Sequence, residues 1–423
     1  MRARLAATLE SVDEAARLAL DSMRLQPVRS LLAIAGVVVG IVTVVVVASV
    51  LANVRNQVAL LFRELGTDNI FAFHLSGDPY SPASESEAGR RPLKTEYAAA
   101  LERLGPDIRD VGVEIILPAI INDRPVIVRA GASESDTALL EGASANYFDI
   151  VGAAFSRGRP FTPLEDREGA RVAILGASLA RALFGSASGL GRPVVVSGET
   201  YTVVGELARR RGGFFGENRQ DSVISIPAGA AERRFGVPDR VVLYIRAKPG
   251  RRAEAFSETE TILRRLRRLD ANAPDDFHLS TADQIIGTLD RLGASVGLVT
   301  VAFALVSLFI GGIGIANVMI ISVTERTREI GLRMALGAQR RRVLLQFLLE
   351  AAFLSGLGGL AGVALSLLIG FAMRAFISEF SAVAPLWAIV TGLAASVSVG
   401  VVAGYWPARR AARLDPVDAL RHE

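Results

Sequence analysis

Four long stretches without a charged residue dominate the pattern of hydrophobic and polar positions. They cover residues 31–52, 292–324, 351–373 and 380–406. At about 1.5 Å per helical residue, the first of them is roughly 33 Å long, enough to cross the hydrocarbon core of a bilayer. Buried helices of soluble proteins rarely reach these lengths, so the pattern predicts four transmembrane helices.

The first stretch is predicted to stay in the mature chain and not to serve as a cleaved signal peptide. Four acidic residues lie in the segment that precedes it. Its apolar core is also longer than the apolar region of a signal peptide.

The arginines predict the orientation of these helices. Residues 1–29 hold five arginines, residues 325–350 six and residues 407–423 four, whereas the turn 374–379 holds one. Short loops rich in Lys and Arg stay in the cytoplasm. Both termini and the 325–350 loop are therefore predicted to be cytoplasmic, and residues 53–291 to lie outside the cytoplasmic (inner) membrane of a bacterium.

The segment outside the membrane alternates β-rich runs with helical runs, which predicts an α+β domain. The expected strands are 70–75, 111–117, 125–130, 171–175, 193–197, 201–206, 223–226 and 240–247. The expected helices are 95–104, 178–184, 228–235 and 252–269.

The two ends of this domain each carry a narrow apolar stripe along one helix face. The stripe after the first span and the stripe around the start of the second have matching spacing. The two stripes consist of Val54, Val58, Leu61 and Leu65, and of Ile285, Leu289, Leu292 and Val296. They predict an antiparallel helical stalk whose seam they form; the alternative is that each helix packs separately on the outside domain.

Composition supports the membrane reading and narrows the chemistry. Half of the residues (51%) are hydrophobic and the mean hydropathy is +0.37, which excludes disorder and a nucleic-acid-binding tail. With no cysteine in the chain, disulfides, thiolate metal sites and cysteine nucleophiles are excluded.

The chemistry search predicts no catalytic residue and no metal site. Neither lysine, Lys94 or Lys248, follows a glycine, so no G-K-[ST] phosphate loop exists in these 423 residues. The three histidines stand apart, without metal-ligand spacing. The four spans contain no charged side chain, which argues against a proton-coupled carrier.

Small residues recur at four-residue intervals in the spans. Three ladders consist of Gly36 and Gly40; of Gly358, Gly362, Ser366 and Gly370; and of Gly392, Ser396, Gly400 and Gly404. Such ladders let helix backbones approach closely, within one subunit or between subunits.

The loop at 325–350 has an unusual pattern. Ser322 and Glu325 form a possible capping box for a short helix that ends near Gly337. Ile330 and Met334 lie on one face of this helix and are predicted to be exposed, as a docking surface for a partner's groove. Charged side chains surround them at Arg326, Arg328, Glu329 and Arg333. The retention of positive charge in the cytoplasm is the alternative explanation for the arginines.

Two segments then carry a family resemblance. The run 324–338 (TERTREIGLRMALGA), followed by Phe347 and Glu350, resembles the signature of MacB/FtsX-like ABC transporter permeases, as does the tail 407–420. In the outside domain, the segments that resemble the MacB-type periplasmic core are 65–70, 158–161, 169–176 and 183–185.

The resemblance implies a fold, a partner and a mechanism. The fold is an α-helical membrane protein with four transmembrane helices and an α+β extracytoplasmic domain of the MacB type. Residues 1–30 are expected to form a cytoplasmic amphipathic helix. The outside domain is expected to divide into a stalk-proximal part, 53–120 and 240–291, and a distal part, 125–235.

The implied machine is a homodimer or paired permease on two cytoplasmic ATPase subunits. ATP and Mg bind to the ATPase, and the segment Glu325 to Gly337 corresponds to the helix that couples to it. Mechanical transmission through the stalk then moves substrate on the outer side of the membrane. Exporters of the family also work with a membrane-fusion protein and an outer-membrane channel, and the sequence leaves open whether this chain does.

One feature departs from the founding macrolide exporter, whose ATPase is fused on the same chain. This sequence is therefore expected to be a permease subunit with a separate ATPase, exporting or handling a peptide, drug or lipid-linked substrate. The alternatives are a non-transporting regulator of a cell-wall hydrolase and a lipoprotein-release permease. An outside segment of 239 residues (53–291) favours the exporter, because cell-division members of the family have smaller ones.

Overall fold

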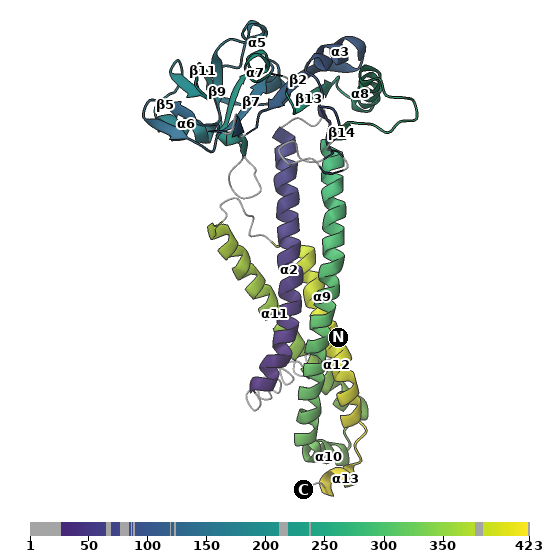
Figure 1. The fold of residues 1–423 in the computed structure, drawn as a ribbon. Helices are drawn as coiled ribbons and strands as arrows, with labels where there is room; N and C mark the ends of the chain where they lie inside the picture. The colour runs from purple at the N-terminus through teal and green to yellow at the C-terminus, as the bar shows by residue number, and fades with distance from the viewer. Residues whose placement is uncertain are drawn as a thin grey trace. The chain divides into compact units, whose positions relative to one another are not determined.

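The computed structural model divides the chain into two compact units (Figure 1). One comprises Met1–Val54 and Asp290–Glu423, and the other comprises Arg55–Leu289. The described residues are 27–64, 69–76, 84–85, 87, 89–118, 120–121, 124–210, 219–236, 238–376 and 384–421. The amphipathic helix expected at 1–30 lies almost entirely outside them, and so does Leu65.

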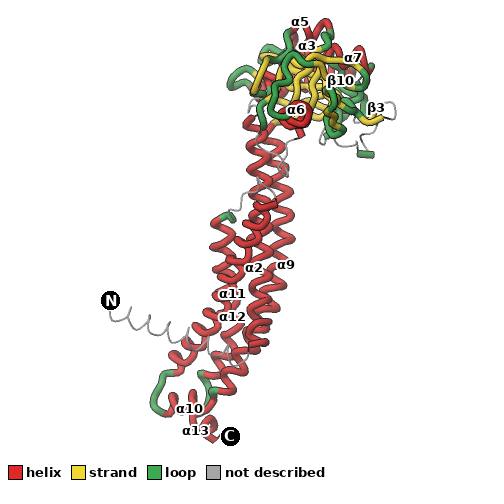
Figure 2. Tube along the Cα trace, turned by 90° about the vertical axis from the view of Figure 1, so that its left-hand side faces the viewer, coloured by secondary structure: helices red, strands yellow, loops and turns green. Residues whose placement is uncertain are grey.

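Four long helices carry the predicted spans. They are α2 (Pro27–Glu64), α9 (Ala282–Glu325), α11 (Arg340–Phe376) and α12 (Leu386–Ala411). All four are long and apolar enough to cross a membrane, which confirms the four predicted spans. Each is longer than its uncharged core except α12; the 44 residues of α9 extend over about 66 Å. Figure 2 shows these helices running alongside one another.

The first glycine ladder joins α2 to α9. A β-carbon on Gly36 would lie 2.8 Å from the Cα of Gly311, and one on Gly314 would lie 2.8 Å from the Cα of Ala33. Real β-carbons do not approach so closely, so glycine is needed at both contacts. The two backbones therefore touch directly, and the ladder serves packing within one chain.

The contact register of α9 corrects the predicted stalk seam. The α9 positions that meet α2 include Gly293, which faces Leu51, and the buried Ala304. Leu292 and Val296, which were expected in the seam, are 59% and 47% exposed. The prediction was wrong for these two residues. The face of α9 that contacts α2 is displaced from the predicted face by about one position in the sequence. In a helix that is apolar all round, small residues mark the close partner better than large ones do.

The other seam residues whose side chains the structure describes are buried or half-buried. Val58 is buried, at 5% exposure, and Val54, Ile285 and Leu289 are half-buried. Leu61 lies in α2, but its side chain, like Leu65, lies outside the described part.

The corrected register can be tested by crosslinking, because the chain has no native cysteine. We expect a Leu51→Cys, Gly293→Cys pair to crosslink within one chain, since a β-carbon on Gly293 lies 3.9 Å from the Leu51 side chain. The matched pair Leu51→Cys, Val296→Cys is expected to give no crosslink within one chain. The reverse pattern on a denaturing gel would restore the original seam.

The other two ladders join α11 to α12 and to α2. A β-carbon on Gly400 would lie 2.6 Å from the carbonyl oxygen of Ala351, and one on Gly404 would lie 2.4 Å from the Ala351 side chain. On α11, Gly358 and Gly362 face Val37 and Ile41 of α2 in the same way. These ladder positions therefore hold one bundle of four helices together.

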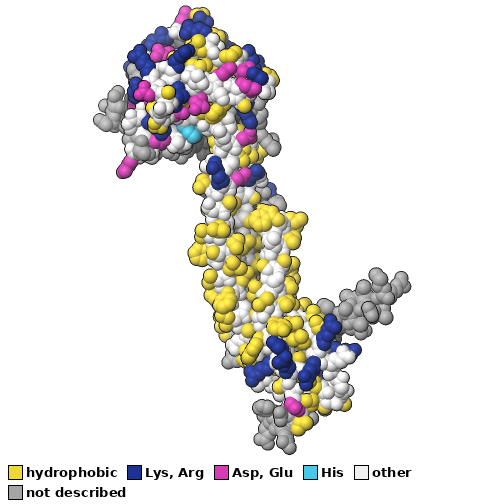
Figure 3. Space-filling view, turned by 90° about the vertical axis from the view of Figure 1, so that its right-hand side faces the viewer, with side chains coloured by type: hydrophobic (Ala, Val, Ile, Leu, Met, Phe, Trp, Pro, Cys, Tyr) yellow, Lys and Arg dark blue, Asp and Glu magenta, His cyan; other side chains and the backbone are white. Residues whose placement is uncertain are grey.

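The outer surface of the helical unit is largely apolar, and most of its described charged residues lie in 325–350 and 409–415. On the face drawn in Figure 3, hydrophobic side chains cover most of this surface and arginine side chains gather toward its lower end. Large exposed side chains include Phe309, Ile310 and Leu368, at 71%, 60% and 64% exposure. The hydrocarbon of a bilayer is the medium in which such a surface is stable.

The second unit is built on one twelve-stranded sheet. Along its main path the strand order is β14-β1-β13-β2-β7-β12-β9-β11-β10-β5-β6, and β8 pairs with β11. The strands are β1 (Asn69–Phe73), β2 (Ile108–Ile116), β5 (Val128–Ala130), β6 (Ser133–Ser135), β7 (Leu139–Ala143), β8 (Phe155–Gly158), β9 (Val172–Leu175), β10 (Pro193–Val196), β11 (Glu199–Leu207), β12 (Val223–Pro227), β13 (Val241–Ala247) and β14 (His278–Thr281). β3 (Ile120–Ile121) and β4 (Arg124–Pro125) form a separate pair.

Short helices cover the sheet on both faces, as the two cores show. One core contains residues of α3 (Glu96–Leu104), α6 (Ala177–Phe184), α7 (Ala228–Phe235) and α8 (Arg252–Arg267). The other contains Tyr147, Phe148 and Ile150 of α4 (Tyr147–Ile150) and Phe161, which precedes α5 (Pro163–Glu168). The predicted α+β class is confirmed, and the predicted strands and helices all fall on observed ones.

The sequence reading missed strands β3, β6, β7, β8 and β14 and helices α4 and α5. The central strand β7 is the most telling of them, because its sequence, Leu-Leu-Glu-Gly-Ala, places a glutamate and a glycine in the middle of the sheet. Both residue types are depleted in strands. Tertiary packing overrides that preference here, and Glu141 is 4% exposed.

Candidate functional site

The residues expected to couple to a partner lie in a short helix between α9 and α11. This helix, α10, comprises Thr327–Ala335. Its start differs from the prediction: α9 runs on to Glu325, and Ser322 is a buried residue inside α9. The predicted capping box was therefore wrong, because an N-cap needs a non-helical backbone and Val323, 6% exposed in the core, keeps the helix going. The break falls at Arg326, with φ −101° and ψ 15°.

The end of α10 agrees with the prediction. Gly337 has φ +95°, a left-handed conformation that favours glycine. Its amide donates to the carbonyl of Met334 at 3.0 Å, and the amide of Ala338 donates to the carbonyl of Arg333 at 3.1 Å. These bonds satisfy the last carbonyls of the helix and turn the chain into α11.

The face predicted to be exposed points into the protein. Ile330 is 4% exposed and belongs to the same core as Val343 and Phe347 of α11. Met334 is half-buried against this core. The prediction of an exposed Ile330 and Met334 pair was wrong, because their apolar face buries itself on the chain's own spans.

The exposed face of α10 carries a different apolar pair. Leu332 is 52% exposed and Leu336 is 82% exposed. Leu336 directly follows α10 as its C-cap residue, four residues after Leu332, so the two lie on one side, roughly opposite to Ile330 and Met334. Glu325 and Arg328 are exposed beside them. Sequence spacing alone could not separate the two pairs, because both have the same interval.

The C-terminal tail packs against α10 at Gly331. A β-carbon on Gly331 would lie 2.5 Å from the β-carbon of Ala419, which is 1% exposed in α13 (Pro416–Arg421). The loop motif and the tail motif therefore meet directly. This contact explains why a glycine stands in the middle of α10, where it costs about 1 kcal/mol relative to alanine.

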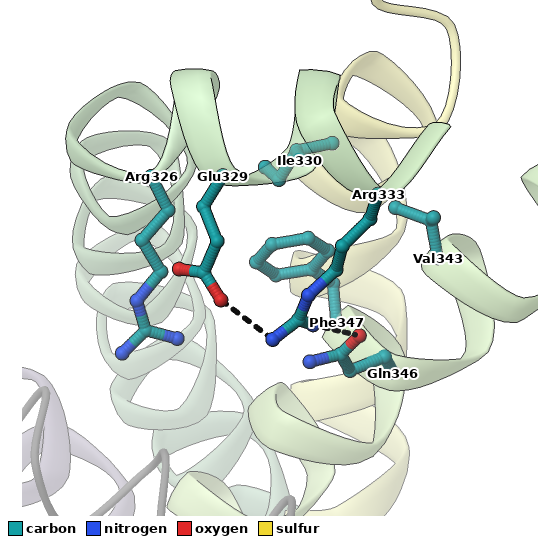
Figure 4. A pocket seen from close by; sticks show the side chains of 7 residues that line it. All are labelled: Arg326, Glu329, Ile330, Arg333, Val343, Gln346 and Phe347. Carbon is teal, nitrogen blue, oxygen red and sulfur yellow. Dashed lines mark hydrogen bonds and ion pairs between the residues drawn. The ribbon is translucent and has the colours of Figure 1, made fainter. Parts of the chain in front are cut away.

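A polar network fixes α10 to α11 (Figure 4). Arg333 donates to Glu329 at 2.5 Å and to Gln346 at 3.2 Å. Arg326, at the break, lies 3.5 Å from Glu350, whose side chain is 3% exposed. The cavity between these residues measures about 10 Å³, room for one water molecule at most. The network therefore holds the helix in place and forms no pocket for an organic ligand.

These contacts divide the predicted coupling residues by role. Ile330, Met334, Arg326 and Arg333 support the helix from within, Glu325 and Arg328 lie on the outside, and Glu329 pairs with Arg333 while half its side chain is exposed. Gly337 ends the helix. In the described part of the chain, no group of three or more His, Asp or Glu side chains could hold a metal ion.

Comparison with protein families covers most of the chain. The MacB-like periplasmic core domain matches residues 30–259, and the FtsX-like permease C-terminal region matches residues 301–416. The second match contains α10, the break at Arg326 and the start of α13.

Individual relatives agree with these family matches. The chain is 33% identical to the pyoverdine export ATP-binding/permease protein PvdT of Pseudomonas aeruginosa, over 96% of this chain and 58% of the relative. It is 32% identical to the macrolide export ATP-binding/permease protein MacB of Burkholderia cenocepacia, over 99% of this chain and 59% of the relative. The chain thus spans somewhat more than half the length of these relatives.

Among solved structures, the periplasmic region of MacB from Actinobacillus actinomycetemcomitans aligns with 54% of this chain and 96% of its own. The identity is 18% and the TM-score is 0.44. The family matches cover both the sheet unit and the membrane helices, and the chain belongs to the MacB/FtsX-like family of ABC transporter permeases.

Proposed function

We propose that this chain is the membrane subunit of an ABC-type exporter and that α10 is the element through which an ATPase drives it. The observation that carries the proposal is the exposed pair Leu332 and Leu336 on a helix braced by α11 and α13. A helix packed against both α11 and α13 can transmit a displacement by a partner to α9 and α11. Exposed leucines four residues apart fit an apolar groove.

The ATPase is proposed to be a separate subunit that binds ATP and Mg. The 423 residues contain no G-K-[ST] phosphate loop, so the nucleotide must be bound by other residues. The relatives' names combine an ATP-binding part with a permease part. That pairing supports an ATPase as the partner of α10.

The proposed orientation places α10 and both termini in the cytoplasm, in the inner membrane of a bacterium. Exposed arginines gather around α10 at the start of α11 and the end of α12: Arg340, Arg341, Arg342, Arg409 and Arg410. Positive charge of this kind stays on the cytoplasmic side. The sheet unit would then lie in the periplasm, where a membrane-fusion protein and an outer-membrane channel are further proposed partners.

The chain is proposed to act as a homodimer joined along α9. About 20 residues suffice to cross a bilayer, so roughly half of the 44-residue α9 extends beyond it. Leu292 and Val296 lie in that half and are exposed in the single chain. Apolar side chains exposed to water are unfavourable, and contact with the α9 helix of a second copy would bury them. A single Val296→Cys substitution should therefore crosslink two copies, whereas Gly293→Cys, which faces α2, should not.

The substrate class is proposed to be a peptide, a drug or a lipid-linked compound, moved on the outer side by mechanical transmission. The uncharged spans offer no polar path through the bilayer, which supports transmission over conduction. The relatives' names refer to export of pyoverdine and macrolides. A regulator of a cell-wall hydrolase and a lipoprotein-release permease remain the competing functions.

Spin labels test the mechanical part of the proposal. A cysteine at Ala182, an exposed position on α6, labels each copy of the outside domain once. We expect the distance between the two labels to change when the ATPase is trapped with vanadate, compared with the nucleotide-free complex. Equal distance distributions in the two states would contradict transmission to the outside domain.

A further inference from the structure

Two groups of strands in the sheet of the outside domain meet where β2 pairs with β7. Strands β14, β1, β13 and β2 form one group, and β7 begins the other. β2 pairs with β7 over three residues, Glu114 to Ile116, whereas β2 pairs with β13 over seven. β2 is therefore joined to β7 by fewer paired residues than to β13.

A pair of buried carboxyl groups spans this junction. Glu114 on β2 is 1% exposed, and Glu141 on β7 is 4% exposed. The register places Glu114 opposite Ala143 and Ile116 opposite Glu141. Because residues two apart in a strand point to the same face, the two glutamates share one face and are diagonal neighbours.

Hydrogen bonds extend the pair across four strands. The hydroxyl of Tyr244 on β13 donates to Glu114 Oε2 at 2.5 Å, and the hydroxyl of Ser225 on β12 donates to Glu141. The two buried carboxyl groups lie on one face of adjacent strands, where their negative charges would repel each other. A proton on one of them removes this repulsion and lets that carboxyl donate a hydrogen bond. The geometry therefore favours one proton at the junction itself.

The surroundings favour retention of that proton at neutral pH. Burial, and then the charge of Glu114, raise the pKa of Glu141 to about 8. From α4, Tyr147 faces the pair, and burial together with both carboxyls raises its pKa as well. Arg210, which follows β11, is the cation whose charge acts on Glu141 and Tyr147 in the opposite direction. Its effect is smaller than that of burial.

We propose that the junction between β2 and β7 is a proton-dependent joint: one proton shared by Glu114 and Glu141 holds the two groups of strands together, and its loss at alkaline pH places two negative charges across the joint and weakens it. The sign follows from linkage. A carboxyl whose pKa is raised in the folded chain contributes its full stability below its ordinary pKa, and this contribution is lost as the pH rises through about 8. The joint is therefore strongest at acidic pH, still holds its proton at neutral pH, and weakens as the pH rises through about 8.

The test uses the full chain in lipid nanodiscs, with two readouts at about pH 6 and about pH 9.5. Infrared difference spectroscopy follows the carbonyl band of protonated carboxylic acid. Spin labels at Ser257 on α8 and Ala182 on α6, both exposed, report the distance between the two strand groups. We expect the wild type to lose the band of one carboxyl per chain between these pH values and its distance distribution to broaden.

Two variants and one control distinguish the loss of the shared proton from a general effect of pH on the protein. Glu141→Gln and Glu114→Gln each remove the shared proton without adding charge, so both should lack the titrating band and keep one narrow distribution at both pH values. Glu134→Gln, an exposed glutamate on β6, should behave as the wild type does. An unchanged wild-type distribution across this range, or equal broadening in the Gln variants, would overturn the proposal.

Discussion

Glutamate at both Leu332 and Leu336 is expected to abolish stimulation of the partner ATPase while the permease stays folded. The two leucines are 52% and 82% exposed, so the substitutions remove little packing within the chain. In a complex, each glutamate would place an unpaired charge in an apolar groove, at a cost of roughly 2 kcal/mol or more. Together they weaken docking by about a thousandfold. ATPase rate and co-purification of the two subunits measure the effect.

One control lies at a buried position of α10, and the other lies in the outside domain. Ile330→Glu is expected to lower the thermal stability of the permease itself, because this side chain is 4% exposed in the core shared with α11. Leu104→Glu, at an exposed position of α3, is expected to leave ATPase stimulation unchanged. If the Leu332 and Leu336 variant still binds and stimulates the ATPase, α10 does not dock through its exposed face.

Gly400→Ala is expected to destabilise the helical unit by about 3 kcal/mol, at the upper end of the usual cost of overpacking. The added methyl group would lie 1.9 Å from Ser355 Oγ and 2.6 Å from the carbonyl oxygen of Ala351. The hydroxyl can rotate away, but the backbone oxygen cannot, so α11 and α12 must separate. Thermal unfolding of the purified permease in detergent, and the yield of folded protein, report the loss.

Gly356→Ala is the matched control on α11. Its added methyl group would be no closer than 3.8 Å to its nearest neighbour, Val397, which is an ordinary contact. We expect a change in stability of at most about 1 kcal/mol, in the stabilising direction of helix propensity. Equal effects of the two substitutions would mean that close backbone contact between α11 and α12 does not hold the bundle together.

Sequence patterns located the membrane helices well but did not identify their contact faces. Length and the absence of charge suffice for a span, and all four were found. Which face of a helix makes contacts depends on the element that packs against it, and that element is often distant in the sequence. The α10 helix buries Ile330 because Val343 and Phe347 lie beside it and Ala419 closes over Gly331. The pattern around α10 is symmetric enough that nothing local distinguishes Leu332 from Ile330.

The outside domain shows the same limit at strand β7. A pattern that expects alternating apolar residues rejects a segment with Glu141 at its centre. The structure gives this glutamate a hydroxyl partner from β12 and places it beside a second carboxyl from β2, and only tertiary pairing brings these groups together. The missed strand and the proposed proton-dependent joint therefore have one physical cause.

The most direct measurement of the central claim is an affinity purification of the full chain from its native membrane in mild detergent, with ATP hydrolysis assayed on the eluate. The account predicts recovery of a separate ATPase subunit whose hydrolysis depends on the permease and is lost with the Leu332 and Leu336 variant. An eluate without an ATPase, or one whose hydrolysis is the same with that variant, would contradict coupling through α10.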